Sequence, residues 1–194
     1  MDLNKQSNII PPVTEGIKRP KWSVMIPTYN PKEQFLIQAV NSVIIQDLGS
    51  DKMQIEVVDD CSTKVDVEKI VNDNWKGRVN YHRLPENVGH SFNFTECVRR
   101  SKGELVHLLH DDDKVKPGFY KIFESIFAKY ENTGAVFCRQ EYIDDDDKFM
   151  FHSELEMDDA GILDDALIKL AEKQRIQYCA MVVKREVYEK IKSK

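Results

Sequence analysis

The chain has 194 residues, with 28 Lys and Arg against 33 Asp and Glu, so its formal net charge is −5. Hydrophobic residues make up 41% and charged residues 31% of the chain, which is typical of one folded globular domain with short additions, not of a disordered or fibrous protein. No apolar run approaches the ~18–20 residues of a membrane-spanning helix, and the net acidity argues against a nucleic-acid partner.

The first twenty residues are polar and contain Pro11, Pro12 and Pro20. We interpret residues 1–20 as a polar N-terminal extension, either a flexible tail or an arm packed on the surface, and residues 21–194 as the domain. The extension contains no apolar stretch of the signal-peptide kind, and the four cysteines include no CxxC pair, which predicts free buried thiols in a reducing compartment. The sequence therefore predicts a cytoplasmic protein.

The first half of the domain alternates short apolar strands with amphipathic helices. Asn30 and Pro31 predict a helix N-cap followed by proline at the first helical position. In chain order, the pattern predicts a strand at 23–27, a helix from 31 to about 46, a strand at 54–58, a helix at about 64–75, a strand at 79–84 and a helix at about 91–101.

The second half continues this alternation around an acidic stretch. Residues 141–165 hold eleven acids and one Lys, a net charge of −10, and within them residues 143–147 predict a solvated hairpin tip. The predicted elements are a strand at 104–109, a helix beginning at Pro117, a strand at 135–138, a helix near 164–174, a strand near 177–183 and a helix from Arg185. Strands alternating with helices predict an α/β fold with a mostly parallel sheet flanked by helices.

Polar residues follow several of these strands directly. The carboxyl ends of parallel strands meet at one edge of the sheet, where α/β proteins bind their ligands. The most acidic of these segments is the run Asp111, Asp112 and Asp113, whose adjacent charges repel one another unless a cation joins them. Mg²⁺ or Mn²⁺ would suit such oxygen ligands and would keep open positions for a diphosphate. The alternative is a solvated acidic turn that Lys114 and Lys116 neutralise.

Three further segments at strand ends have both a functional and a structural interpretation. The Asp59–Asp60 pair could accept hydrogen bonds from a ribose or a base, or could cap the turn that follows. Residues 27–30 could place Tyr29 against a base, or could form a plain strand-to-helix turn. Residues 85–89 could bring the backbone at Gly89 close to a ligand, or could be an ordinary loop.

Five ordered motifs between residues 21 and 118 resemble family 2 of the inverting GT-A glycosyltransferases, which move a sugar from a nucleoside diphosphate donor. The matching segments are 22–30 (WSVMIPTYN), 42–46 (SVIIQ), 54–62 (QIEVVDDCS), 86–89 (ENVG) and 103–113 (GELVHLLHDDD). The resemblance implies a GT-A fold for the domain and a divalent cation, Mn²⁺ or Mg²⁺, as cofactor.

The resemblance also implies roles for individual residues. Asp113 would be the principal metal ligand, with Asp111 beside it, and the metal would neutralise charge on the leaving diphosphate. The residues implied to bind the nucleotide sugar are Pro27, Thr28, Tyr29, Asp59, Asp60, Asn87, Gly89, Asp111 and Asp112. The donor would be a nucleoside diphosphate sugar, with a UDP-sugar favoured. The acceptor would be a glycan, a lipid carrier or a protein, and the protein could associate peripherally with the inner face of a membrane.

The sequence departs from the family pattern at three places. His110 stands where the family often has Asp, and residues 91–95 supply no Arg to the donor. The family's catalytic acidic pair lies beyond the segment that residues 178–188 resemble, so we expect a domain truncated at its C-terminus and name no catalytic base. A nucleotide-sugar-binding fragment without turnover is therefore one alternative. A receiver-like phosphoacceptor domain is the other, because Asp59 and Asp60 also resemble the acidic pair of that class.

Overall fold

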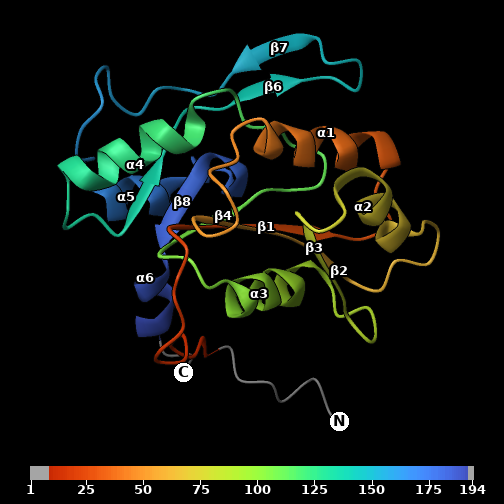
Figure 1. Cartoon of the computed structure of the whole chain (residues 1–194). Helices are drawn as coiled ribbons and strands as arrows, with labels where there is room; N and C mark the ends of the chain where they lie inside the picture. The colour runs from red at the N-terminus through yellow and green to blue at the C-terminus, as the bar shows by residue number, and fades with distance from the viewer. Residues whose placement is uncertain (1–8, 192–194) are drawn as a thin grey trace.

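Six strands form the central sheet of the protein, in the spatial order β3-β2-β1-β4-β8-β5. The computed structural model describes residues 9–191 (Figure 1). The strands are β1 (Trp22–Thr28), β2 (Met53–Asp59), β3 (Asn80–Arg83), β4 (Leu105–Leu108), β8 (Met181–Lys184) and β5 (Ala135–Phe137).

Strands β3, β2, β1 and β4 are parallel to one another, whereas β8 runs antiparallel to both β4 and β5. All seven residues of β1 are buried, and so are all seven of β2, as expected for inner strands that are covered on both faces. The register places Thr28 opposite Asp59. The predicted mostly parallel α/β sheet is confirmed, and the carboxyl ends of β1 and β2 lie side by side.

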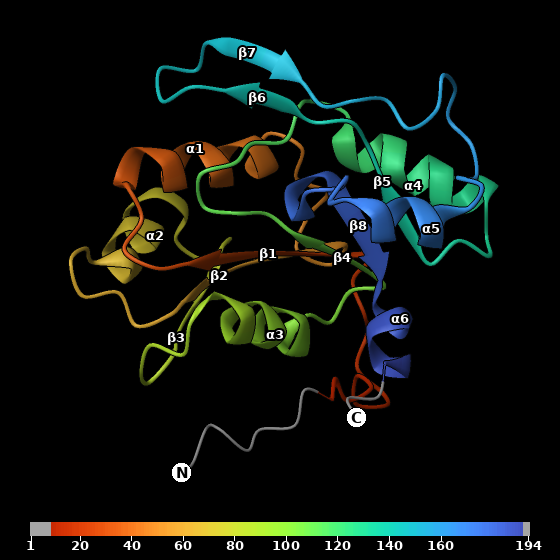
Figure 2. The same cartoon turned by 180° about the vertical axis from the view of Figure 1, so that it is seen from behind.

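Helices cover both faces of this sheet (Figures 1 and 2). On one face lie α1 (Glu33–Ile44), α2 (Val67–Trp75) and α4 (Phe119–Lys129); on the other lie α3 (His90–Arg100) and α6 (Arg185–Lys190), while α5 (Ala166–Glu172) follows the acidic stretch. Side chains alternate along β1, so Val24 and Ile26 join the larger core with α1, α2 and α4. Met25 points the other way, into a smaller core with Cys97 and Val98 of α3.

The N-terminal segment from residue 9 packs on the α3 side of the sheet. Ile10 is buried in the smaller core, and the carbonyl of Pro11 accepts a hydrogen bond from the buried Arg185 guanidinium at 3.1 Å. Arg19 donates to the carbonyls of Lys102 and Gly103 at 2.9 and 2.8 Å. The described part of the extension is therefore a packed arm, while residues 1–8 lie outside the described residues.

The acidic stretch forms a ribbon of two antiparallel strands, β6 (Glu141–Ile143) and β7 (Phe149–His152), which confirms the predicted hairpin tip. The ribbon lies over α1 and the chain that leads into α4 (Figure 1). Three exposed ion pairs connect it to the body: Lys32 with Asp145, Lys114 with Asp147, and Lys116 with Glu141. The alternative interpretation had Lys114 and Lys116 neutralise the aspartate run, but both lysines pair with the ribbon instead.

Two other predictions, of a strand and of the burial of the cysteines, hold only in part. The strand near 177–183 is wrong at its start: residues Tyr178–Ala180 form a 3₁₀ turn, η2, and β8 begins only at Met181. The turn closes because Ala180 N–H donates to the Gln177 carbonyl at 3.0 Å. The prediction of free buried cysteines holds in part, since all four thiols are free but only Cys97 is buried, while Cys138 is exposed.

Gly103 lies where the chain entering β4 touches the backbone of β1. A Cβ atom at this position would stand 2.5 Å from both the backbone nitrogen of Ser23 and the carbonyl carbon of Trp22. We expect Gly103→Ala to lower the free energy of unfolding by about 1–3 kcal/mol, because a rigid backbone must shift. Urea denaturation measures this loss. Gly161→Ala is the matched control, since the nearest atom there is the flexible end of Met157. Equal stabilities of the two variants would contradict the expectation.

Candidate active site

The carboxyl ends of β2, β1 and β4 bring the predicted site residues together at one edge of the sheet. The backbone N–H of Asp60 donates to the Thr28 carbonyl at 2.9 Å. The hydroxyl of Thr28 in turn donates to the carboxylate of Asp111. Since Thr28 contacts residues from both neighbouring strand ends, the predicted convergence of these segments on one region is confirmed.

Asp60 connects the end of β2 to the start of α3. Its carboxylate accepts hydrogen bonds from the backbone N–H groups of Val88 at 2.7 Å and Gly89 at 2.9 Å, and from the Asn87 side chain at 3.0 Å. Gly89 has a φ of 84° and immediately precedes His90, the first residue of α3. The glycine is needed there because a φ of this sign is unfavourable for other residues. Asp60 thus sets the position of the loop that carries Asn87 and Gly89.

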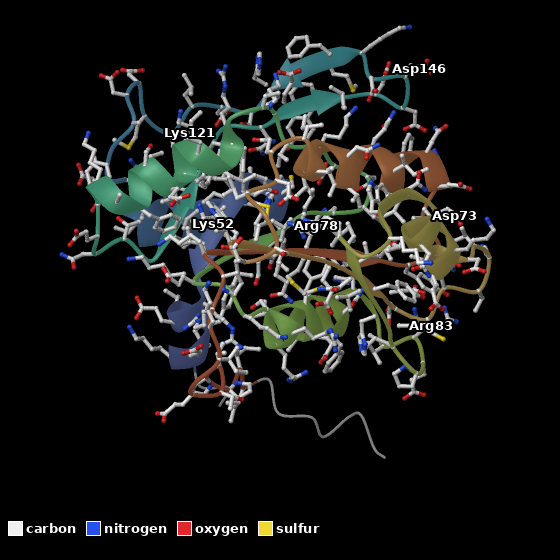
Figure 3. The ribbon with its side chains drawn as sticks, viewed as in Figure 1. Lys52, Asp73, Arg78, Arg83, Lys121 and Asp146 are labelled. Atoms are coloured by element: carbon white, nitrogen blue, oxygen red, sulfur yellow. The ribbon has the colours of Figure 1, made fainter. Side chains whose placement is uncertain are left out.

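Asp59 is completely buried, and its carboxylate points toward β3. Its carboxylate accepts from the Ser62 backbone at 2.9 Å and the Ser62 hydroxyl at 2.5 Å, and from Tyr81 and Arg83 at 2.8 Å each. Figure 3 labels Arg83, which lies directly opposite Asp59 in the strand register. Four donors surround this carboxylate, so its evident role is to join β2, β3 and the loop at Ser62. Contact between Asp59 and a nucleotide sugar stays a prediction.

The segment that follows β1 offers one exposed aromatic side chain. Tyr29 is 50% exposed, whereas Pro27 is buried within the strand. Asn30 has a positive φ of 49°, and its side-chain oxygen accepts from the backbone N–H groups of Thr63 and Lys64 at 2.8 Å each. The predicted N-cap at Asn30 is wrong, because α1 begins at Glu33 and Asn30 holds the neighbouring loop instead. Tyr29 is thereby left half-exposed at the end of β1.

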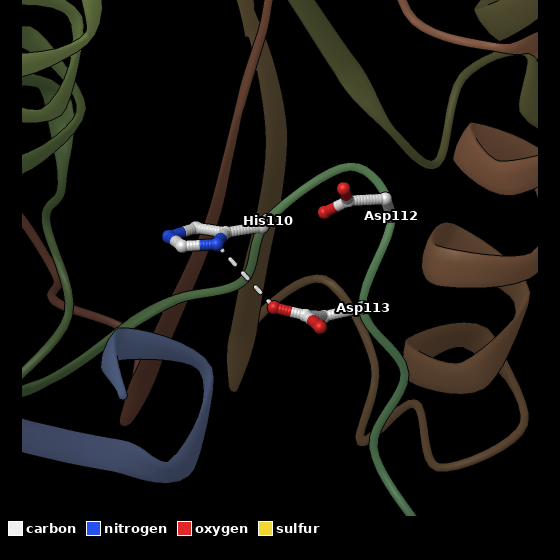
Figure 4. Close-up of side chains that lie close together, drawn as sticks. All are labelled: His110, Asp112 and Asp113. Carbon is white, nitrogen blue, oxygen red and sulfur yellow. Dashed lines mark ion pairs between the residues drawn. The ribbon is translucent and has the colours of Figure 1, made fainter. Parts of the chain in front are cut away.

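Three side chains after β4 form a candidate metal centre. One ligand atom from each of His110, Asp112 and Asp113 lies within 4.8 Å of the others (Figure 4). The His110 Nδ1 atom stands 3.3 Å from an Asp113 carboxylate oxygen. Two carboxylates suit a hard divalent cation, and an imidazole is a compatible third ligand. The residues present therefore fit a divalent cation.

The charges of this cluster support one another. The hydrogen bond to Asp113 raises the pKa of His110, with the neighbouring aspartates adding to the effect. Burial alone would raise the pKa of Asp113, but the hydrogen bonds from His110 and the Cys179 thiol outweigh it and bring that pKa below its ordinary value. Asp113 is therefore held as a carboxylate, the form that binds a cation.

Asp111 stands apart from these three residues. Its carboxylate accepts the hydroxyl hydrogen bond from Thr28, and burial raises its pKa. Among residues 9–191, the ligand cluster contains Asp113 but not Asp111. The structure thus brings one of the two predicted metal ligands into the cluster, together with His110, which the sequence had placed only as a departure from the family pattern.

Two aromatic side chains pack beside the ring of His110. Phe94 of α3 lies 5.3 Å from it and Tyr178 of η2 lies 6.3 Å from it, measured between ring centroids. The Nε2 atom of His110 is buried without a hydrogen-bond partner. The imidazole is therefore held by aromatic packing and by Asp113.

The model of the family described as Glycosyl transferase family 2 matches residues 23–192, which is most of the chain. The chain belongs to glycosyl transferase family 2. The resemblance seen in the sequence is confirmed, and the receiver-domain interpretation is wrong. Among the described residues, none of the helices has the length and apolar character needed to cross a bilayer.

Several curated family 2 relatives match part of the chain. An N-acetylglucosaminyltransferase of Mesorhizobium japonicum is 33% identical over 114 residues, which are 56% of this chain and 27% of that protein. The poly(ribitol-phosphate) beta-N-acetylglucosaminyltransferase TarS of Staphylococcus aureus is 29% identical over 96 residues, which are 49% of this chain and 17% of TarS. The chain thus spans about a quarter or less of the length of these relatives.

Solved structures share the fold of this family 2 domain. S. aureus TarS 1–349 superposes with a TM-score of 0.59 at 18% identity, covering 89% of this chain and 52% of the TarS chain. The mannosyltransferase PcManGT of Pyrobaculum calidifontis, in complex with GDP-Man and Mn²⁺, gives a TM-score of 0.53 at 24% identity, covering 70% and 39%. The predicted GT-A architecture is confirmed.

The site also depends on residues that the sequence analysis did not single out. Tyr81 and Arg83 hold Asp59, and Phe94 and Tyr178 hold the ring of His110. A signal for Arg83 was available, because an Arg ending one strand beside an Asp ending the next suggests a cross-strand pair. Tyr178 gave no such signal, since its contact depends on the 3₁₀ turn.

Proposed function

We propose that this domain binds a nucleoside diphosphate sugar at the carboxyl edge of its sheet, and that the protein transfers the sugar to an acceptor hydroxyl with inversion. The observation that carries the proposal is the convergence of Thr28, Asp60 and the His110–Asp113 turn at one edge of a family 2 domain. The donor class follows from chemistry, because exposed aromatic surface, hydrogen-bonding carboxylates and a cation site suit a base, a ribose and a diphosphate respectively.

Each group in the site has a distinct task in this proposal. Tyr29 lies against the nucleobase, and Asp60 with the loop at Asn87 and Gly89 forms the wall that receives base and ribose. Asp112 and Asp113 hold a divalent cation, with His110 at their side. A bound Mn²⁺ or Mg²⁺ would supply positive charge to the leaving diphosphate. Asp111, held by Thr28, accepts a hydrogen bond from the ribose in this proposal.

A UDP-sugar, with UDP-GlcNAc first among the candidates, is the proposed donor. Support comes from two curated relatives named N-acetylglucosaminyltransferase and from a TarS structure in complex with UDP-GlcNAc. The acceptor is a glycan, a lipid carrier or a protein, reached in the cytoplasm or at the inner face of a membrane.

A nucleotide-sugar-binding fragment without turnover is the second candidate, and one observation favours it. Glu154 and Glu156, two acidic residues of the stretch before α5, form ion pairs with Lys173 and Arg175. Both carboxylates are paired with a cation, so neither stands out as the catalytic base. We name no catalytic base in this chain.

Thermal unfolding with a panel of nucleotides tests both candidates. We expect UDP and UDP-GlcNAc to raise the Tm by about 5–10 °C at ~100 times Kd, because binding to the folded state alone stabilises it by ~2.7 kcal/mol. The increase should require Mn²⁺ or Mg²⁺ and should be smaller for GDP and GDP-Man.

Measurements in EDTA and a radiolabelled transfer assay complete this experiment. A Tm increase that persists unchanged in EDTA would contradict the role of the cation. Hydrolysis or transfer of the sugar by residues 1–194 would exclude the binding-only candidate, whereas binding without transfer would support it.

A further inference from the structure

Asn93 is a polar side chain buried beneath the carboxyl ends of β1 and β2. It lies in the first turn of α3, the helix that runs along this face of the sheet in Figure 2, and only 2% of its surface is exposed. Its side-chain Nδ2 atom donates to the carbonyls of Val58 at 3.1 Å and Thr28 at 3.4 Å. One amide group, which carries two hydrogens, thus bridges two neighbouring strands next to the candidate active site.

Asn93 also closes a ring of four hydrogen bonds. Its backbone N–H donates to the Gly89 carbonyl at 3.0 Å, and the Gly89 N–H donates to the Asp60 carboxylate at 2.9 Å. The Asp60 N–H donates to the Thr28 carbonyl at 2.9 Å, and the Asn93 side chain donates to that same carbonyl. The ring therefore joins the end of β1, the end of β2 and the loop before α3, which are the segments that the proposed function assigns to the base and the ribose.

The side-chain oxygen of Asn93 shows what the residue is there for. Among the residues that the structure describes, Asn93 Oδ1 is buried and has no hydrogen-bond partner. A buried acceptor without a partner is unfavourable for folding, and a leucine, whose side chain has the same branched shape, would avoid this cost. An amide at this position is therefore explained by the hydrogen bonds that it donates, and not by packing.

We propose that Asn93 is a positioning residue that holds the ends of β1 and β2 against the loop at Gly89, so that the wall for the nucleoside is assembled before the donor binds. This inference rests on the proposed function, because it assumes that the nucleoside binds at this wall. Since its side chain is buried, Asn93 acts through Thr28, Asp60 and Gly89 and not by touching the ligand. The ring contains no residue of the candidate metal centre, so its loss should leave cation binding intact.

Calorimetric titration of Asn93→Ala and Asn93→Leu with UDP in the presence of Mn²⁺ tests the proposal. Both substitutions remove the amide, but only alanine leaves a cavity. We expect both variants to bind UDP ~10-fold more weakly than the wild type, because a wall assembled in only about a tenth of the molecules raises the apparent Kd by that factor. Mn²⁺ alone should bind to both variants as it does to the wild type. Asn74→Leu is the matched control, since its amide also donates to a backbone carbonyl, that of Ile70, but within α2.

Amide hydrogen exchange gives a readout that a loss of overall stability would not produce. The N–H groups of Val88 and Gly89 donate to Asp60, so they should exchange faster in both variants than in the wild type. Amides in the middle of β2 should keep their wild-type rates, because only the wall is loosened. The Tm of each variant without ligand is measured alongside, so that titrations are made where every variant is folded.

The outcomes distinguish this inference from the proposed function. Wild-type UDP affinity in Asn93→Leu overturns the positioning role alone, because side-chain volume then suffices. Exchange that accelerates equally throughout the sheet, or Mn²⁺ binding that weakens in step with UDP binding, also overturns it, because the damage is then general. A wild-type protein that fails to bind UDP overturns the proposed function, and with it this inference.

Discussion

Asp113→Ala is expected to remove the metal-dependent part of nucleotide binding. Asp113 is one of two carboxylates in the cluster, and without it only Asp112 and the imidazole of His110 remain to hold a hard cation. The Tm increase of about 5–10 °C that we expect for UDP with Mn²⁺ should therefore disappear in the variant. Calorimetric titration with Mn²⁺ alone should show the corresponding loss of metal affinity.

Two other aspartates serve as comparisons in this experiment. Asp73→Ala removes an exposed carboxylate of α2 and should keep the full Tm increase. Asp111→Asn keeps a hydrogen-bond partner for Thr28 and tests the second ligand that the sequence predicted. Weaker Mn²⁺ binding in Asp111→Asn would add Asp111 to the ligand set. A Tm increase in Asp113→Ala equal to that of the wild type would contradict the assignment of the metal centre.

Asp59→Ala is expected to produce a large loss of stability that does not depend on any ligand. The substitution leaves the buried backbone N–H and hydroxyl of Ser62 unpaired, and it also removes the partner of Tyr81 and Arg83. We expect the free energy of unfolding to fall by about 2–4 kcal/mol, because each buried donor left unpaired costs ~1–3 kcal/mol while the half-exposed Arg83 can be rehydrated. Chemical denaturation measures this change.

Asp146→Ala provides the control for charge removal. Asp146 lies at the tip of the β6–β7 ribbon, far from Arg83 in Figure 3, and we expect its loss to change stability by less than ~0.5 kcal/mol. If Asp59→Ala unfolds like Asp146→Ala, the four hydrogen bonds to Asp59 contribute little. Loss of UDP binding in a folded Asp59→Ala protein would instead support the predicted contact of Asp59 with the nucleotide.

The sequence predicted the parts of the fold that local patterns encode. Apolar runs marked β1, β2 and β4, and the polar residues after them marked the edge where the site lies. The sequence contained no signal for the direction of β8, because a short apolar strand has the same residue pattern in a parallel and in an antiparallel pair. The turn η2 was predicted as strand for a similar reason, since its residues are also common in strands.

The sequence predicted a site residue where the residue type alone indicates its role. It did not do so where the role depends on a contact with a residue distant in the chain. A run of three aspartates suggested a cation, but only the contact with Thr28 shows that Asp111 faces away from the cluster. The contacts of the buried His107 could not be predicted either, because Cys179 and Tyr120 lie 72 and 13 residues away along the chain. Contacts of this kind follow from the fold and not from spacing.

The packed arm has a practical meaning for anyone who shortens this protein. Because residues 1–20 are polar and rich in proline, truncation up to Pro20 looks harmless from the sequence. It would remove Ile10 from the smaller core and the Pro11 carbonyl that accepts a hydrogen bond from the buried Arg185 guanidinium. The guanidinium would then keep the Ser101 carbonyl and Glu189 but lose its contact with the arm. Trimming should therefore stop before Ile10, and affinity tags are better joined by a spacer that leaves the arm seated.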